Sequence, residues 1–250
     1  MNSLEVSVAL EGNAVRVVND RFQTSLETFR HPETGSRIDL AAIIHAADAE
    51  YYQEIDRLTA AREAGGMILQ SEKIMPVPEA AAAAYPALAT LHALHMELRE
   101  ANRREASRIG LVPQIDHLRI GEVHDVTFDQ HVKNKGPYAR QNYESRLIRE
   151  RTFTSQFNLS ERQIHDQGLL LIAGLTRQDI FGSGQNYDAE LIRETKQFDA
   201  IKETLQEDPG SSFILHWGAA HIPGFRDSCQ ELGYQLEDQR WITSQSLILG

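Results

Sequence analysis

Two stretches of the chain, residues 38–72 and 212–241, follow the same order of local patterns. In each, an apolar run typical of a buried strand is followed by a histidine, an amphipathic helix, a glycine and a second strand. The first stretch places His45 after IDLAAII, and the second places His221 after FILHWGAA. A strand, a crossover helix and a parallel strand form a right-handed unit, so each histidine is expected at the carboxyl end of its first strand.

This repetition predicts an α/β fold with a central, mostly parallel sheet and two pseudo-repeated βαβ units. Ligands of open α/β sheets bind at the carboxyl edge, so His45 and His221 are expected to face one cavity. We expect one domain over residues 1–250, which is long enough for a sizeable core. Residues 79–108 are predicted to form a helical insertion or cap, and residues 138–206 a further mostly helical segment.

The composition excludes several classes of partner and site. A formal net charge of -11 argues against nucleic acid and anionic membrane as partners, because both require clustered Lys and Arg. The first residues lack a basic segment followed by a long apolar one, and we expect a cytoplasmic protein. Cys229 is the only cysteine, so any metal must bind His, Asp or Glu.

Small residues follow the strand of the second stretch. Gly218, Ala219 and Ala220 let the backbone and a ligand approach each other closely. The helix that is expected to begin near Pro223 directs its N-terminal amides toward the same space. This arrangement suits an anion or a polarised oxygen.

The two stretches resemble the motifs of a known family. LHWGAAHIPGF, followed by LGY, is similar to the second GxxH motif of the TraB/Tiki family, and IDLAAIIHAADAEYYQEI with ILQSE resembles the first. The resemblance spans roughly residues 15–241, and it is the pairing and order of the motifs that makes it specific. It implies a compact α/β domain related to the erythromycin-esterase and ChaN-like proteins, and its animal members look like divalent-metal proteases.

The resemblance also assigns residues. The family's two motif histidines correspond to His45 and His221, its strand-terminal acid to Glu72, and its second-motif glycine to Gly218. The dipeptide His124–Asp125 matches a His-Asp-like element of related sequences more weakly.

The chain departs from the family pattern at three places. Ala42 stands where the family has Gly, and Arg193–Glu194 stands where relatives often have Arg-Asn. His216 adds an imidazole where relatives often carry an apolar or aromatic residue. Strand alternation leaves two readings of His216, a structural histidine that faces away from the cavity and a part of the site.

Two chemical schemes use the same three residues. Two imidazoles and a carboxylate from His45, Glu72 and His221 suit Mn, Co, Zn or Fe with open positions for water and substrate. Without a metal, His45 and Glu72 act as a base and its orienting partner, and His221 stabilises the developing oxyanion. The residues predicted to contact substrate are Gly218, His124, Asp125 and Arg193.

The sequence therefore predicts a hydrolase that cleaves an amide or ester bond of a peptide or small secondary metabolite, and the preferred scheme is attack by divalent-metal-activated water held by His45, Glu72 and His221. Two alternatives remain open: a non-hydrolytic enzyme that performs a cyclisation or elimination in the same pocket, and a protein that binds heme, a metal or an organic ligand. Each histidine also has a plain structural reading as a hydrogen-bonded core residue. The Ala-rich helix after Pro78 suits close packing as a cap over the site or as a homodimer interface.

Overall fold

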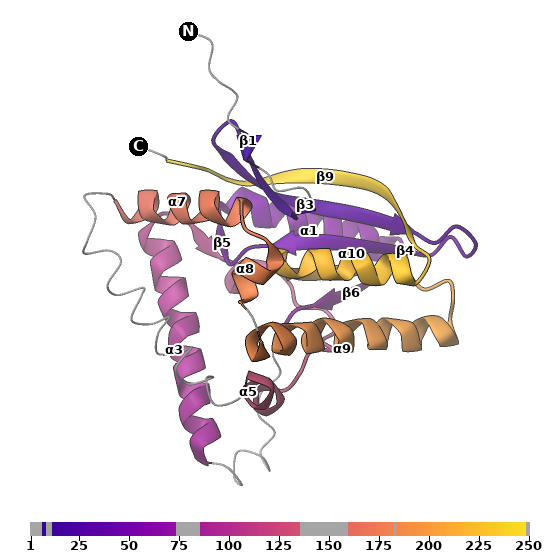
Figure 1. The fold of residues 1–250 in the computed structure, drawn as a ribbon. Helices are drawn as coiled ribbons and strands as arrows, with labels where there is room; N and C mark the ends of the chain where they lie inside the picture. The colour runs from indigo at the N-terminus through magenta and orange to yellow at the C-terminus, as the bar shows by residue number, and fades with distance from the viewer. Residues whose placement is uncertain (1–6, 9–11, 74–85, 136–159, 183, 249–250) are drawn as a thin grey trace.

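A computed structural model describes residues 7–8, 12–73, 86–135, 160–182 and 184–248. Its centre is a sheet with helices on both faces (Figure 1). The strands of this sheet within the described residues are β1 (Ser7–Val8), β2 (Val15–Val18), β3 (Arg21–Arg30), β4 (Arg37–Ile43), β6 (Ile68–Ser71), β8 (Phe213–Gly218) and β9 (Gln235–Ser246). The helices are α1 (Ala49–Ala64), α3 (Pro86–Arg108), α4 (Gln114–His117), α5 (Phe128–Lys135), α7 (Glu161–Ala173), α8 (Arg177–Phe181), α9 (Gln185–Glu207) and α10 (Ile222–Glu231), with a 3-10 turn, η2 (Ala219–His221), before the last.

The sheet is mixed. Its strands follow the order β1-β2-β3-β4-β8-β6, and β9 pairs with β3 as well. The pairs β4·β8 and β8·β6 are parallel, whereas β1, β2, β3 and β9 pair antiparallel. The prediction of an α/β fold with a central sheet is therefore confirmed, and the parallel pairing is confined to three neighbouring strands.

The parallel strands are buried on both faces, which explains their continuous apolar runs. In β8, Phe213, Leu215 and Trp217 pack in a core with residues of α9 and α10. The residues between them point to the opposite face, which α1 covers with Tyr52 and Ile55. Both faces of β4 and β8 are thus covered. Polar side chains within these strands pair with α1, Asp39 with Arg62 and His216 with Thr59.

The first crossover connects β4 to β6 through α1. Tyr51 and Tyr52 donate hydrogen bonds from their hydroxyls to the carbonyls of Ala42 and Ile44, both at 2.8 Å, and so tie α1 to the end of β4. The helix ends at Gly65, as the glycine after the first predicted helix indicated. Gly66 has a φ of +87°, a conformation that favours glycine, and the chain then turns into β6.

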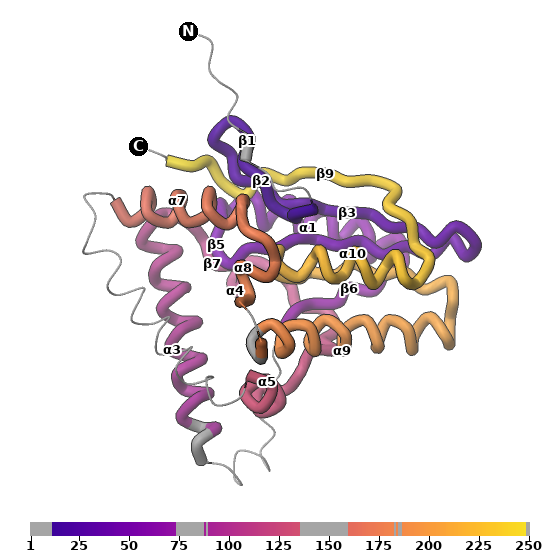
Figure 2. The backbone as a smooth tube through the Cα atoms, viewed as in Figure 1, coloured from indigo at the N-terminus to yellow at the C-terminus, as the bar shows by residue number. Residues whose placement is uncertain are grey.

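α3 contacts the sheet region through a small ribbon. A short two-stranded ribbon of β5 (Ala46–Ala47) and β7 (Val112–Pro113) lies between the sheet and α3 (Figure 2). α7 begins after Ser160, which forms a capping box with Gln163. The predicted helical residues 79–85 and 138–159 lie outside the described residues.

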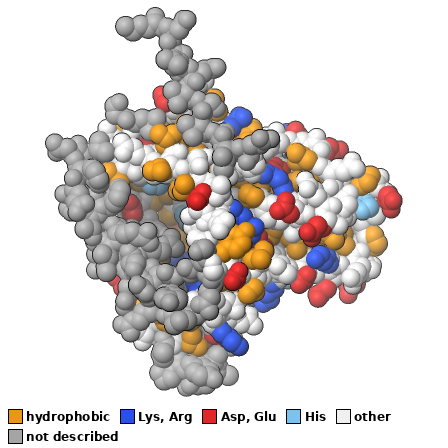
Figure 3. Space-filling view, viewed as in Figure 1, with side chains coloured by type: hydrophobic (Ala, Val, Ile, Leu, Met, Phe, Trp, Pro, Cys, Tyr) orange, Lys and Arg blue, Asp and Glu red, His pale blue; other side chains and the backbone are white. Residues whose placement is uncertain are grey.

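The outer surface carries charges of both signs. On the face in Figure 3, Asp and Glu side chains are interspersed with Lys and Arg around a small group of hydrophobic side chains. Among the described helices, none combines the length and the apolar character that a bilayer crossing requires.

Candidate active site

The three residues of the predicted site follow three adjacent strand ends. β4 ends opposite β8, with Ile43 paired to Gly218, and β6 ends opposite it with Ser71 paired to His216. His45, His221 and Glu72 come shortly after these ends. Parallel pairing therefore places all three residues at the same edge of the sheet, as predicted.

Glu72 is held by the backbone of β8. The N–H of Gly218 donates to Glu72 Oε2 at 2.7 Å, and the N–H of Glu72 donates to the carbonyl of His216 at 2.9 Å. A Cβ on Gly218 would lie 3.0 Å from Glu72 Oε2. Gly218 thus contributes its N–H and the space that its missing side chain leaves to Glu72, and its predicted contact with substrate stays a prediction.

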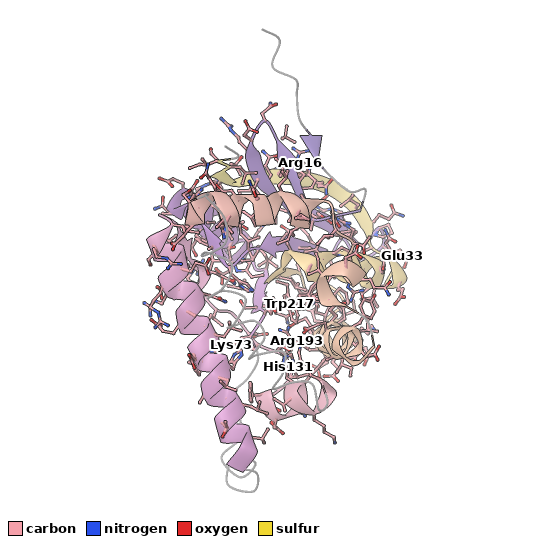
Figure 4. All side chains as sticks on the ribbon, turned by 60° about the vertical axis from the view of Figure 1, so that its left-hand side comes forward. Arg16, Glu33, Lys73, His131, Arg193 and Trp217 are labelled. Carbon is pink, nitrogen blue, oxygen red and sulfur yellow. The ribbon has the colours of Figure 1, made fainter. Side chains whose placement is uncertain are left out.

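Arg193 of α9 lies at the centre of the cluster, between Trp217 and His131 (Figure 4). Its Nη2 donates to Glu72 Oε1 at 2.8 Å and to Asp125 Oδ2 at 2.5 Å. Its Nε donates to Asp125 Oδ1 at 2.9 Å and its Nη1 to Glu190 Oε2 at 2.8 Å. The guanidinium, whose side chain is 5% exposed, thus joins three carboxylates from separate parts of the chain.

His221 lies beside the same carboxylates. Its Nδ1 is 2.8 Å from Glu194 Oε1. Its Nε2 is 3.7 Å from Glu72 Oε1 and 4.0 Å from Glu190 Oε2. The imidazole therefore presents one nitrogen to Glu194 and the other to the two oxygens that Arg193 also binds.

The charges of the cluster shift its pKa values in opposite directions. Burial alone would raise the pKa of Glu72, but the charges of Arg193 and His221 and the Gly218 N–H outweigh burial and lower this pKa to about 2. The pKa of Glu190 is also lowered, because Arg193 and Lys135 outweigh the effect of burial. Burial would lower the pKa of Arg193, yet the carboxylates around it raise this pKa well above its ordinary value. The carboxylates of Glu72 and Glu190 and the guanidinium are therefore ionised at neutral pH.

His45 lies on the exposed side of the cluster. Its Nδ1 is 3.1 Å from Gln114 Oε1. Because an amide oxygen only accepts, Nδ1 is the donor and the neutral ring keeps its lone pair on Nε2. The charge of His45 also contributes to the lowered pKa of Glu72. His45 is exposed and the Glu72 side chain is 19% exposed, whereas His221 and Arg193 are buried, so a substrate would meet His45 and Glu72 first.

The His124–Asp125 element divides between two places. Asp125 is buried on Arg193, whereas His124 is half-buried with its Nε2 3.4 Å from Glu122 Oε2. The segment reaches Arg193 by pairing with β6, where Glu122 exchanges backbone hydrogen bonds with Leu69 and Ser71. Gly121 permits this approach, since a Cβ there would collide with the Leu69 carbonyl.

His216 lies on the other face of β8. Its Nε2 is 2.8 Å from the hydroxyl of Thr59 in α1, and burial lowers the pKa of His216 to about 4. The sequence left two readings of this residue. The structure places it in a hydrogen bond beneath α1.

Several residues of the cluster were not predicted as site residues: Lys135, Arg177, Glu190, Glu194 and the buried His131, whose pKa burial lowers to about 3. A signal for part of this set does exist in α9. Glu190, Arg193, Glu194 and Gln197 recur at helical spacing and are all buried. Charged residues on the stripe that should be apolar indicate a buried ionic cluster.

The described residues do not offer the predicted metal a ligand set. The types of donor atom suit a metal ion. Nε2 of His221 faces the carboxylate oxygens of Glu72 and Glu190, and its Nδ1 contacts the carboxylate of Glu194. Arg193, however, already donates to Glu72 Oε1 and Glu190 Oε2, the two oxygens that face His221 Nε2. Within the part of the chain that the structure describes, no group of three or more His, Cys, Asp or Glu side chains is placed to hold a metal ion. The metal site at His45, Glu72 and His221 stays a prediction.

Comparisons with known proteins add no assignment: no family model, no curated protein and no solved structure matches the chain. The resemblance to the TraB/Tiki family therefore rests on the paired motifs of the sequence.

Proposed function

We propose that this protein is a hydrolase that cleaves an amide or ester bond of a peptide or small metabolite at the carboxyl edge of β4, β8 and β6. One observation carries the proposal. Glu72 and His221, which lie far apart in the sequence, approach to 3.7 Å around the guanidinium of Arg193, with His45 on the exposed side. Titratable groups with strongly shifted pKa values that gather at such an edge are typical of active sites.

The chemistry follows from the exposed imidazole. Nε2 of His45 accepts a proton from a water molecule as the water oxygen attacks the carbonyl carbon of the substrate. The ionised Glu72 stabilises the imidazolium that forms, because its negative charge lies close to His45. When the tetrahedral intermediate collapses, the imidazolium returns the proton to the departing alcohol or amine. The products are an acid and an alcohol or amine, and His45 returns to its neutral form.

The buried part of the cluster stabilises the charge that this step creates. The intermediate carries a negative charge on the former carbonyl oxygen, and a fixed cation in a water-poor site stabilises such a charge. The nearest fixed cation is Arg193, whose charge is shared with the carboxylates of Glu72, Asp125 and Glu190, and His221 lies beside it. The step needs no other reactant than water.

Two finer features of the fold belong to this proposal. The segments β4–α1–β6 and β8–α10–β9 would be two copies of one unit, each of which delivers a histidine to the site. α3 would act as the cap over the cluster. The contact of α3 with the β5–β7 ribbon, which directly follows His45, supports this placement.

A screen in isotopically labelled water tests the reaction class. Purified protein is incubated in H2-18O with p-nitrophenyl butyrate, a small lactone, an N-acyl amino-acid amide and a peptide anilide, and the products are analysed by mass spectrometry. Hydrolysis places one oxygen of the solvent in the acid product. The parallel samples are His45→Gln, Glu72→Gln and, as the matched control, His31→Gln in the turn between β3 and β4 at the opposite end of the strands.

The proposal expects labelled acid from at least one substrate class with wild type and His31→Gln, and a loss of about 100-fold or more in His45→Gln. Turnover to a product without solvent oxygen would overturn hydrolysis in favour of cyclisation or elimination. Stoichiometric retention of a small molecule with no product from any class would overturn it in favour of a binding protein.

A further inference from the structure

We propose that Glu194 is a positioning residue that fixes the ring of His221, so that Nδ1 donates to Glu194 and Nε2 faces Glu72 and Glu190. The catalytic meaning of this inference rests on the proposed function, although the geometry of the ring does not. Nδ1 lies 2.8 Å from Glu194 Oε1, and both side chains are nearly fully buried. An ionised carboxylate only accepts hydrogen bonds, so the proton of this contact belongs to Nδ1.

Glu194 is itself held from a third element. Its second oxygen, Oε2, pairs with Nη2 of Arg177 in α8. Arg177 in turn donates from Nη1 to the hydroxyl of Tyr187 at 3.3 Å. The two oxygens of Glu194 therefore have separate tasks: one binds the arginine and the other binds the imidazole.

A glycine leaves room for this pair. Helix α10 begins directly after His221, and Gly224 lies in its first turn. A Cβ on Gly224 would approach Glu194 Oε2 and Arg177 Nη2 to less than 3.0 Å. The pair of Glu194 and Arg177 therefore lies directly against the helix backbone. This close approach sets the position of the carboxylate beside His221.

Aromatic side chains restrict the ring as well. The centroid of the imidazole is 4.7 Å from that of Phe181 and 5.1 Å from that of Trp217, with the Trp217 ring nearly perpendicular. The ring centroid of Phe225 is 6.5 Å from that of the imidazole. These rings fix the plane of the imidazole, and the hydrogen bond to Glu194 selects which nitrogen lies on that carboxylate.

Orientation matters because the two nitrogens face different groups. With Nδ1 on Glu194, Nε2 lies 3.7 Å from the carboxylate of Glu72. If the ring lost this partner, either nitrogen would be able to carry the proton in the neutral form. At metal centres, removal of a group that orients a ligating imidazole typically lowers activity about 10–100-fold, and we expect an effect of the same size here.

Nuclear magnetic resonance of protein with 15N-labelled histidine tests the inference without any substrate. The two ring nitrogens of His221 are assigned in a long-range 1H–15N spectrum by their loss in His221→Gln. We expect Nδ1 to carry a slowly exchanging proton in wild type. In Glu194→Gln we expect the slowly exchanging proton on Nδ1 to be lost. The amide oxygen would accept from Arg177, which only donates, and the amide NH2 would then face Nδ1 of His221 as a donor. Glu203→Gln, an exposed carboxylate on the same helix, is the control and should leave the signature unchanged.

The outcomes separate this inference from the proposed function. A wild-type spectrum in which Nδ1 of His221 carries no proton overturns the inference, whether or not Glu194→Gln folds. An unchanged signature in a folded Glu194→Gln protein also overturns it. Failure to find hydrolysis with any substrate contradicts the proposed function and leaves the spectroscopic result standing. If hydrolysis is found, Glu194→Gln should lower kcat about 10–100-fold with little change in KM.

Discussion

The backbone N–H of Gly218 donates a 2.7 Å hydrogen bond to the carboxylate of Glu72 and thereby joins the ends of β8 and β6. The same carboxylate accepts from Arg193 through its other oxygen. Glu72 is thus fixed at both oxygens, one by the sheet and one by α9. The position of this carboxylate is therefore sensitive to the residue at 218.

Gly218→Ala tests that sensitivity. The added Cβ would lie 3.0 Å from Glu72 Oε2 and 3.5 Å from His221 Cδ2, so the carboxylate must move by a few tenths of an ångström. We expect hydrolysis to fall about tenfold or more, because small displacements of reacting groups are costly, while unfolding free energy falls by only about 1–2 kcal/mol. Steady-state kinetics and urea unfolding measure the two effects. Gly168→Ala, an exposed site in α7 with open space for a Cβ, is the control and should leave activity unchanged. Equal activity of Gly218→Ala and wild type would contradict the assigned role of Glu72.

Among the residues of the cluster, we expect the loss of Arg193 to lower the unfolding free energy most. Arg193→Met would leave the carboxylates of Glu72, Asp125 and Glu190 without the guanidinium that they share. We expect the unfolding free energy to fall by about 3–5 kcal/mol, as for other buried pairs that lose one partner. Arg193→Lys keeps the charge but cannot reproduce the planar set of donors, so we expect it to restore only part of the stability. Chemical denaturation of the three proteins measures this, and a loss below about 1 kcal/mol in Arg193→Met would show that the carboxylates find other partners.

Acid is expected to destabilise the fold through His216. Burial, followed by the charge of Arg119, lowers the pKa of His216 from its ordinary 6.5 to about 4 in the folded protein. The unfolded chain therefore binds a proton at a higher pH than the folded one, and stability is full above pH 6.5 and falls as the pH drops toward 4. The complete loss amounts to about 3 kcal/mol.

Urea unfolding at pH 7, 6 and 5 measures this dependence. His216→Gln removes the titrating group, so its unfolding free energy should depend less on pH than that of wild type over this range. His131, whose pKa is lowered to about 3, acts in the same direction in both proteins. Identical pH dependence of the two proteins would show that His216 is not the neutral, buried group described.

Metal content separates the two chemical schemes. Because Arg193 binds the carboxylate oxygens that face His221, we expect purified protein that was never exposed to nickel to contain far less than one equivalent of Mn, Co, Zn or Fe. We also expect hydrolysis to survive a chelator. Elemental analysis and assays with and without the chelator measure these two properties. Near-stoichiometric metal that disappears in Glu72→Gln would instead support the metal scheme.

The strands and crossovers that carry the site could be predicted because their signals are local. The apolar runs before His45 and His221 contain most of β4 and all of β8, and a glycine, Gly65, ends α1. The antiparallel half of the sheet could not be predicted in the same way. β3 pairs with β9 across more than 200 residues, and no local pattern states which strands become neighbours.

The strand-end residues of the site were predictable, whereas Arg193 was the only residue of α9 that was predicted to belong to it. Glu72 and His221 meet because parallel strands bring their ends to one edge, a rule that needs only the order of elements. Glu190 and Glu194 join them through the rotation and position of α9, which depend on how the helix packs. Their charged stripe indicates burial, but a sequence alone does not show which partner neutralises it.

The measurement that tests the central claim most directly is kcat/KM for the best substrate of the labelled-water screen, compared between wild type, Glu72→Gln and His31→Gln. Circular dichroism and unfolding curves establish that each variant is folded. The account predicts a loss of about 100-fold or more in Glu72→Gln and none in His31→Gln, because only the first variant removes the charge beside His45. A folded Glu72→Gln protein with wild-type kcat/KM would contradict the assignment of this strand-end cluster as the active site.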